Sequence, residues 1–234
     1  MVRPLSLVAG VALMLGCQSP ALVRSARTLP AGGDDLSLSV TLTRVSLRPV
    51  EVDGRSLPLQ DFNLPNPIPD VLYDHGLTDD VQLGARLSLG SGLIEARSML
   101  RVVHAAQGRL HVALAPAAGY RVLALVNGPV FSVPLIVTYD LSPNMSLTGG
   151  PLVSFASYSV PRALDEAEPD LGGSTLYAGG GLGIELRPAF GLHVMPALEV
   201  QRSVWRGGRV QELPVVDMIF FGLTFGWGSR APSP

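Results

Sequence analysis

Residues 36–43 read LSLSVTLT, a run in which Leu or Val alternates strictly with Ser or Thr. Because successive side chains of a strand point to opposite faces of a sheet, this period of two separates an apolar face from a hydroxyl face. Similar alternation returns near residues 81–88, 110–115, 176–187, 192–201 and 215–227. No segment after residue 35 sustains a helical period, and Gly and Pro are too frequent for long helices. The sequence therefore predicts an all-β domain.

The alternating segments and the turn residues between them predict about ten strands. Most of these strands are about 10–14 residues long, which exceeds the usual strand of a soluble sheet and suffices for a tilted strand to cross a bilayer. The second strand is the least regular, because Pro67 and Pro69 remove backbone donors. The ten segments lie near residues 35–48, 66–73, 80–89, 92–103, 109–120, 129–139, 145–158, 174–187, 191–203 and 214–227.

Short and long links alternate between the expected strands. The links HGLTD, HAAQG, DLSPN and RPAFG have about five residues each, whereas the links near 49–65, 121–128, 159–173 and 204–213 are longer. Outer-membrane barrels have short periplasmic turns and longer external loops, and only the link at Gly90-Ser91 departs from that rule. We therefore expect an antiparallel up-and-down β-barrel of the outer-membrane type over residues 35–228, with about ten strands and eight as the alternative.

Alternation alone does not decide which face of the barrel points outward. A soluble, lipocalin-like barrel would turn the apolar face inward, whereas a membrane barrel turns it outward. The polar face consists largely of Gly, Ala, Ser and Thr, which would make a poor soluble surface, so the sequence favours a membrane barrel. Aromatic residues at strand ends would form a headgroup girdle, namely Tyr73, Tyr120, Tyr139, Tyr158 and Trp227. A few charges would pair within a narrow lumen, namely Arg86, Glu95, Arg97, Arg101, Glu185, Arg187 and Glu199.

The amino end has the pattern of an exported lipoprotein. Residues 1–17 read MVRPLSLVAGVALMLGC, with Arg3 followed by an apolar run too short to span a bilayer. The residues LMLGC resemble the bacterial lipobox, in which a small residue precedes an invariant cysteine. That resemblance implies a signal peptide over residues 1–16 and lipidation of Cys17, and Gln18 in place of Asp implies delivery to the outer membrane. Residues 17–34 are expected to form a lipidated flexible tether, and residues 229–234 a disordered tail.

Two short sequence segments resemble segments of a known class of proteins. The segments YDHGLTDDVQLG at 73–84 and GGGLGIEL at 179–186 resemble small outer-membrane β-barrel proteins and lipoproteins of high-GC Gram-negative bacteria such as myxobacteria. This resemblance implies a barrel in the cell envelope, and as partners the outer-membrane lipid and the machineries that assemble barrels and sort lipoproteins. It carries little about function, because one fold serves many functions.

The composition excludes several classes of function. The 17 basic and 19 acidic residues give a net charge of -2. This balance lacks the basic excess that is typical of proteins that bind nucleic acid. The single cysteine forms no internal disulfide, and the four scattered histidines do not have the spacing of a metal site. The glycine run 179–183 lacks the Lys, the Ser or Thr and the helix that a phosphate loop requires. No cofactor site and no metal site are expected.

Three functions remain open from the sequence. The first is a monomeric, non-enzymatic outer-membrane lipoprotein with a structural or surface-interaction role in the envelope, since no catalytic set is evident. The second is a narrow pore or a carrier of small apolar ligands, as in a lipocalin-like soluble barrel on a lipid anchor. The third is a lipid-modifying barrel enzyme, whose nearest candidates are His193 with Glu185 or Glu199 and Ser203. The acidic residues of the 165–170 loop are interpreted as a solvated loop.

Overall fold

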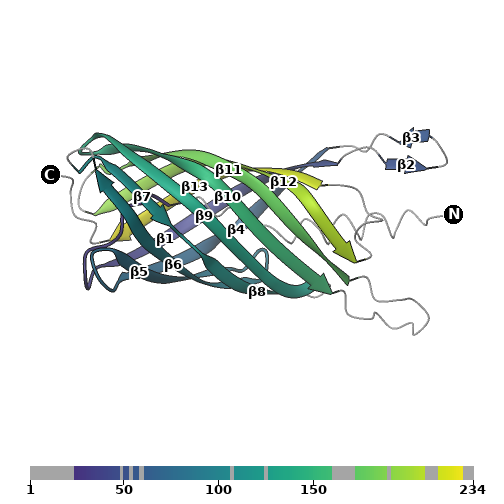
Figure 1. Cartoon of the computed structure of the whole chain (residues 1–234), viewed down its shortest axis with the longest axis horizontal. Helices are drawn as coiled ribbons and strands as arrows, with labels where there is room; N and C mark the ends of the chain where they lie inside the picture. The colour runs from purple at the N-terminus through teal and green to yellow at the C-terminus, as the bar shows by residue number, and fades with distance from the viewer. Residues whose placement is uncertain are drawn as a thin grey trace.

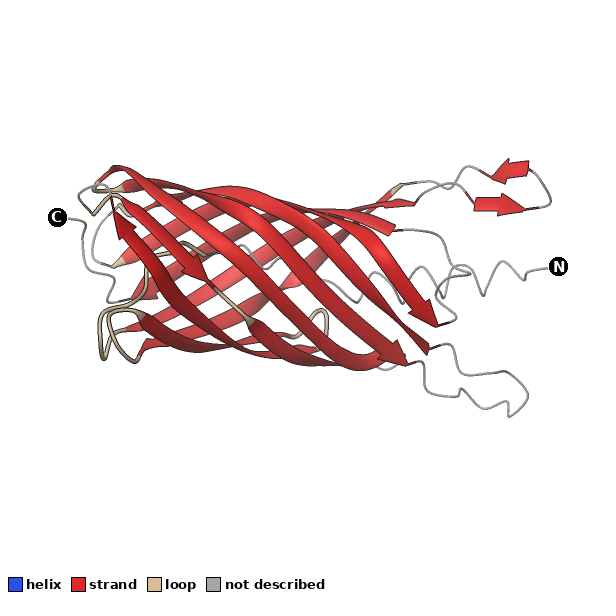
Figure 2. Ribbon diagram, in the orientation of Figure 1, coloured by secondary structure: helices blue, strands red, loops and turns tan. Residues whose placement is uncertain are grey.

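The computed structural model describes residues 24–47, 50–52, 55–57, 61–105, 108–123, 126–159, 172–188, 191–208 and 216–228. Over these residues the chain is all-β and forms a closed antiparallel barrel with ten strand positions (Figure 1, Figure 2). The expected signal peptide, Cys17 and the tail 229–234 lie outside the described residues. Among the described residues, no helix is both long enough and apolar enough to span a bilayer.

The barrel strands follow one another around the wall and close between the first and the last. Strand β1 pairs with β13 from Asp35↔Gly228 to Leu47↔Val216, so the described sheet has no free edge along this seam. The strands are β1 (Asp34–Leu47), β4 (Phe62–Gly76), β5 (Val81–Ser88), β6 (Leu93–Ala105), β7 (Leu110–Leu114), β8 (Ala117–Leu123), β9 (Val126–Ser142), β10 (Met145–Ser159), β11 (Gly172–Leu186), β12 (Leu192–Gly208) and β13 (Val216–Gly228). The expectation of ten strands, rather than eight, is confirmed.

One strand position is divided. The segment expected as a single strand over 109–120 is split into β7 and β8 by Ala115 and Pro116, and both halves pair with β6 and β9. The Ser98 amide donates to the Pro116 carbonyl (2.9 Å), and the Ala115 amide donates to the Pro134 carbonyl (3.0 Å), which holds the break in the wall. Proline lacks the donor that an uninterrupted ladder would need at this point.

The proline-containing strand forms and is longer than expected. Strand β4 begins at Phe62, and its register with β1 shifts between Ser39↔Asp70 and Thr41↔Asn66, which places Pro67 and Pro69 in an irregular stretch. On its other side, β4 pairs with β5 only over Asp70–Gly76. Both prolines thus lie where a missing donor interrupts little of the ladder.

The two ends of the barrel differ in their links. Residues 77–80, 106–109, 143–144 and 187–191 connect strands at one end, called here the turn end, and the opposite end is called the loop end. The loop-end links near 48–61, 160–171 and 209–215 are long as expected, but the expected loop over 121–128 is wrong, because β8 and β9 continue to the pair Leu123↔Val126. A hairpin of β2 (Val50–Val52) and β3 (Arg55–Leu57) stands beyond the rim at the loop end (Figure 1).

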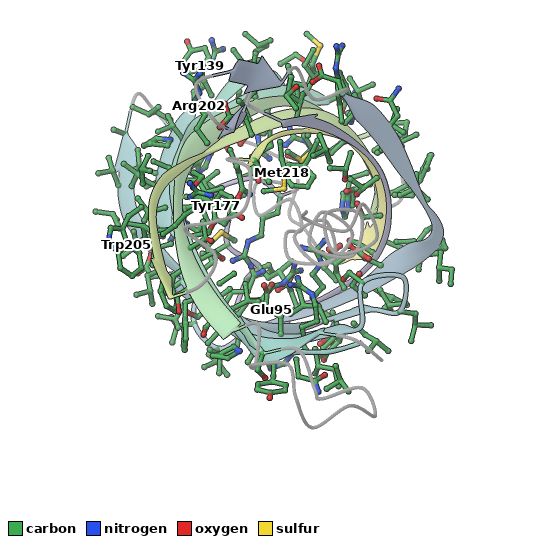
Figure 3. All side chains as sticks on the ribbon, turned by 90° about the vertical axis from the view of Figure 1, so that its right-hand side faces the viewer. Glu95, Tyr139, Tyr177, Arg202, Trp205 and Met218 are labelled. Atoms are coloured by element: carbon green, nitrogen blue, oxygen red, sulfur yellow. The ribbon has the colours of Figure 1, made fainter. Side chains whose placement is uncertain are left out.

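The faces of the strands settle the orientation of the wall. Leu36 exposes 55% of its surface on the outside and its neighbour Ser37 only 4% on the inside, and this alternation recurs around the barrel. Large apolar side chains thus face outward and polar ones face the lumen, the reverse of the lipocalin-like alternative. Tyr177, Met218 and Glu95 point into the barrel, whereas Tyr139 and Trp205 point away from it (Figure 3).

Candidate functional site in the barrel lumen

The lumen is lined by ion pairs between different strands. Arg86 of β5 pairs with Asp70 of β4, and Arg97 of β6 pairs with Asp74 of β4 through two nitrogens. All four side chains are buried. Because charges removed from water need compact, hydrogen-bonded partners, these fork-shaped contacts are the arrangement that the interior requires.

A segment of the chain itself occupies the turn end of this lumen. Residues 24–29 are buried apart from Thr28, which is partly exposed, and they lead to a reversal at residues 30–33, where the Gly33 amide donates to the Pro30 carbonyl (2.8 Å). Gly32 has a φ of 75°, which favours glycine at this reversal. Gly32 and Gly76 are joined through the Gly32 amide and the Gly76 carbonyl (2.8 Å). We call residues 24–31 the internal segment, and its packing differs from the flexible tether expected over 17–34.

Residues of five strands, β4, β6, β7, β9 and β10, hold the internal segment. Arg24 donates to the Ser98 carbonyl (2.9 Å) and lies 3.6 Å from an Asp74 oxygen, and Arg27 pairs with Asp140. Ala26 lies in an apolar cluster with Met99, Ala113, Ala115, Ile136 and Leu152. The segment therefore packs into the barrel wall as a core element does.

Asp140 is the centre of a second group of charges at the turn end. Besides Arg27, it contacts His111 Nε2 (3.2 Å) and lies 3.8 Å from Arg187. Arg187 also donates to Glu185 (3.0 Å) and to the Pro143 carbonyl (3.0 Å). This group ties β7, β9 and the end of β11 to the internal segment.

His193 has neighbours other than those expected from the sequence. Its Nε2 lies 3.4 Å from Ser37 Oγ and its Nδ1 lies 3.5 Å from Asp35 Oδ1, while Ser37 donates to Asp35 Oδ2 (2.8 Å). All three residues are buried, and a Cβ at Gly226 would overlap both the His193 ring and Ser37 Oγ. Packed against backbone in this way, the group has little space for an acyl substrate at the hydroxyl, and Ser37 already directs its proton to Asp35.

The expected catalytic partners lie elsewhere. Glu185 contacts Arg187 and Ser146, and Glu199 accepts from Gln201 (2.6 Å). Ser203 stands ten residues along β12 from His193, which is about 33 Å of extended strand. The candidate enzyme site is therefore not brought together.

The expected lumen charges are largely confirmed. Arg187 pairs with Glu185 as a pair within the expected set, whereas the other arginines of the set pair with aspartates outside it. Arg86, Arg97, Glu185 and Glu199 are buried inside, whereas Arg101 pairs at the turn end with Asp80 (2.6 Å). Sequence reasoning missed the buried carboxylates that face arginines, namely Asp70, Asp74 and Asp140, and it missed Asp35 beside His193. Asp70 and Asp74 share a face with Leu72 on the proline-containing strand, and that spacing of two was the signal available for them.

Two other expectations concern binding groups. Residues 179–183 lie within β11, and a Cβ at Gly179 would overlap the Val200 carbonyl, so the glycines serve the close approach of neighbouring strands. Over the described part of the chain, no group of three or more His, Cys, Asp or Glu side chains is placed to hold a metal ion. The acidic loop 165–170 lies outside the described residues.

Comparisons with known proteins give similarity in structure alone. No protein-family model matches the chain, and no curated protein matches it. Ail of Yersinia pestis is 13% identical, with 85% of this chain and 99% of that chain covered and a TM-score of 0.35. OprG of Pseudomonas aeruginosa is 12% identical, with 89% and 100% covered and a TM-score of 0.35. The Escherichia coli outer membrane protease OmpT is 9% identical, with 87% and 99% covered and a TM-score of 0.39.

Proposed function

We propose that this chain is a lipoprotein of the bacterial outer membrane, held by lipid on Cys17, whose barrel has a non-enzymatic structural or surface-interaction role. The observation that carries the proposal is a barrel wall with apolar side chains outward around a lumen filled by paired charges. An exposed apolar belt of this size needs a bilayer around it, and a closed barrel is the form in which strands cross one. The lipobox-like sequence at residues 13–17 supports the anchor.

The loop end supports a role in surface interaction. The β2–β3 hairpin stands beyond the rim (Figure 1), and the strands at its base are braced where Arg44 and Ser46 donate to Asp61 (3.2 and 3.1 Å). In outer-membrane barrels this end faces the exterior. A peptide tag inserted between residues 53 and 54 is expected to bind antibody on intact cells, whereas a tag after residue 228 is expected to bind only after the envelope is opened.

Barrel and anchor are tested separately. The outer-membrane protein should migrate differently on a gel with and without boiling, as a closed, detergent-resistant barrel does. Labelled palmitate should enter the wild-type chain and not the Cys17→Ala variant. A heat-dependent shift with equal labelling of both chains would remove the anchor and leave the barrel, and the absence of a shift would remove the barrel.

The proposed partners follow from the same features. The apolar wall requires outer-membrane lipid and the machinery that assembles barrels, and lipidated Cys17 would require the lipoprotein-sorting machinery. A wall closed by the β1–β13 pairing needs no second copy, so a monomer is expected in detergent. Membership of a complex would appear as a larger mass by light scattering.

Two assays test the pore and the enzyme alternatives, and each is expected to give a negative result. The buried lumen charges and the internal segment oppose a pore, and the purified protein is expected to leave the conductance of a planar bilayer at its baseline. Lipid A and phospholipid profiles of a His193→Ala strain are expected to match the wild type. A stable conductance or a changed profile would replace the proposed function with a pore or with an enzyme.

A further inference from the structure

We propose that the turn end of the lumen is a binding site for a basic peptide segment, and that residues 24–31 of the chain are its resident occupant. The inference rests on the barrel of the proposed function and does not depend on lipid at Cys17. The evidence is that the wall contacts the backbone, the charges and one small side chain of the segment.

Backbone amides of the segment are bound by side chains of the wall and of the adjoining turn. The Ala26 amide donates to Thr138 Oγ1 (2.8 Å), and the Leu29 amide donates to Gln82 Oε1 (3.1 Å). The Ala31 amide donates to Asp79 Oδ1 (3.1 Å) in the turn after β4. Three donors of a segment without helix or strand thus meet three acceptors from different parts of the barrel, which is how a groove binds the main chain of a peptide.

The charges of the segment meet carboxylates of the wall. Arg24 lies near Asp74 and Arg27 pairs with Asp140, and all four side chains are buried. Buried pairs of this kind select for charge, because a neutral side chain would leave the carboxylates with fewer partners. The site therefore takes a segment with two guanidinium groups three residues apart.

The space available in the wall restricts the two residues between the arginines, Ser25 and Ala26. Ala26 is fully buried in the cluster that includes Met99 and Ile136, so a larger side chain would need the wall to move. Ser25 is also fully buried, so the sequence preference that follows is Arg, two small residues, and then Arg.

The wall is ion-paired without its occupant. Asp74 keeps Arg97, and Asp140 keeps His111 (3.2 Å) and Arg187 (3.8 Å). These carboxylates are not left alone if the segment leaves, so occupied and vacated barrels are both compatible with folding. Ion pairs that persist without the segment distinguish a bound segment from a part of the core on which folding depends.

Release of the segment is measured in the full-length chain. Cys17 is the only cysteine, so Ser25→Cys in a Cys17→Ala background gives a single thiol inside the lumen, close in size to the buried serine that it replaces. In the folded barrel a bulky maleimide is expected to label this thiol at least about tenfold more slowly than in boiled protein. Adding Arg24→Gln and Arg27→Gln should raise the folded-state rate at least about tenfold, and adding the exposed control Arg44→Gln should not. The heat-dependent gel shift confirms that each variant folds.

Binding is measured with a synthetic peptide of residues 22–33 carrying a fluorophore. It is expected to bind the Arg24→Gln, Arg27→Gln chain, whose own segment is weakened, and not the wild type, whose site is occupied. The same peptide with both arginines changed to glutamine should bind at least about thirtyfold more weakly. Rapid labelling of the thiol in otherwise wild-type barrels, or equal binding of the two peptides, would overturn the proposal. Loss of the gel shift in the wild type would instead remove the barrel itself.

Discussion

The outer and inner faces of one strand place the same backbone in opposite environments. Along β1 the outward residues Leu36, Leu38, Val40 and Leu42 are exposed, while the inward residues Asp35, Ser37, Ser39 and Thr41 are buried. In a soluble protein the apolar set would form the core, but here the hydroxyls and carboxylates do. Stability on the inside therefore depends on satisfying polar groups, and on the outside it depends on contact with lipid.

Two Arg–Asp ion pairs, one in the lumen and one near the hairpin, show the same contrast between a buried and an exposed environment. Asp74 is 1% exposed and pairs with Arg97 inside the lumen, whereas Arg44 and Asp61 are 53% and 40% exposed near the hairpin. Water screens the second pair and is excluded from the first. Breaking the first should leave a buried charge without its partner, and breaking the second should leave two solvated ones.

The largest expected effect is at Asp74. The Asp74→Asn substitution removes the charge that faces both Arg97 and Arg24, and the free energy of unfolding is expected to fall by about 3–5 kcal/mol. Urea unfolding in lipid vesicles measures the change, and Asp61→Asn is the exposed control. Equal stability of the two variants would mean that the lumen is as well hydrated as the surface.

The next effect is on the outer face. Val40 stands near the middle of β1 and is exposed to lipid, so Val40→Arg should cost about 2–4 kcal/mol, the range known for a cation near the bilayer midplane. The same unfolding measurement applies, with Val40→Leu as the neutral control. If Val40→Arg were neutral in vesicles, the apolar face would not be the one in contact with lipid.

The strands were predictable because the alternation of apolar and polar residues can be recognised within each short segment. The alternation of residues 36–43 and of 215–227 gave β1 and β13 nearly residue for residue, and the apolar face was correctly assigned outward. The boundaries failed where proline alters the ladder. Pro116 divides one strand, and β4 begins earlier than expected because the wall tolerates Pro67 and Pro69 where β5 does not pair.

The interior was less predictable because it depends on contacts distant in sequence. Ser37 and His193 are 156 positions apart, and nothing local indicates that they meet. The sequence predicts a tether over residues 17–34, which include the internal segment, because the Ser, Pro, Ala and Gly residues there have no period. The order of the internal segment comes from Asp74, Asp140 and Gln82, residues that only barrel closure brings to it.

A smaller effect is expected at Gly226. A Cβ there would overlap the His193 ring and Ser37 Oγ, so Gly226→Ala should lower the free energy of unfolding by about 1–3 kcal/mol as the ring moves. Removing the ring in a His193→Ala, Gly226→Ala chain should recover part of that difference, as a double-mutant cycle would report, because Ser37 Oγ still meets the added Cβ. An additive result would show that the glycine serves the backbone rather than the histidine.

The smallest effect is expected at Arg44. Its guanidinium donates to Asp61 (3.2 Å) in water at the base of the hairpin, and an exposed pair of this kind contributes about 0–1 kcal/mol. Arg44→Ala should therefore leave the unfolding free energy almost unchanged, with any difference disappearing at high salt because screening already weakens the pair. Ser46 still donates to Asp61 (3.1 Å) in this variant, so antibody binding to a tag between residues 53 and 54 should also persist. A loss of several kcal/mol would place this pair in an environment as dry as that of Asp74, and the contrast between the two faces would then fail at the loop end.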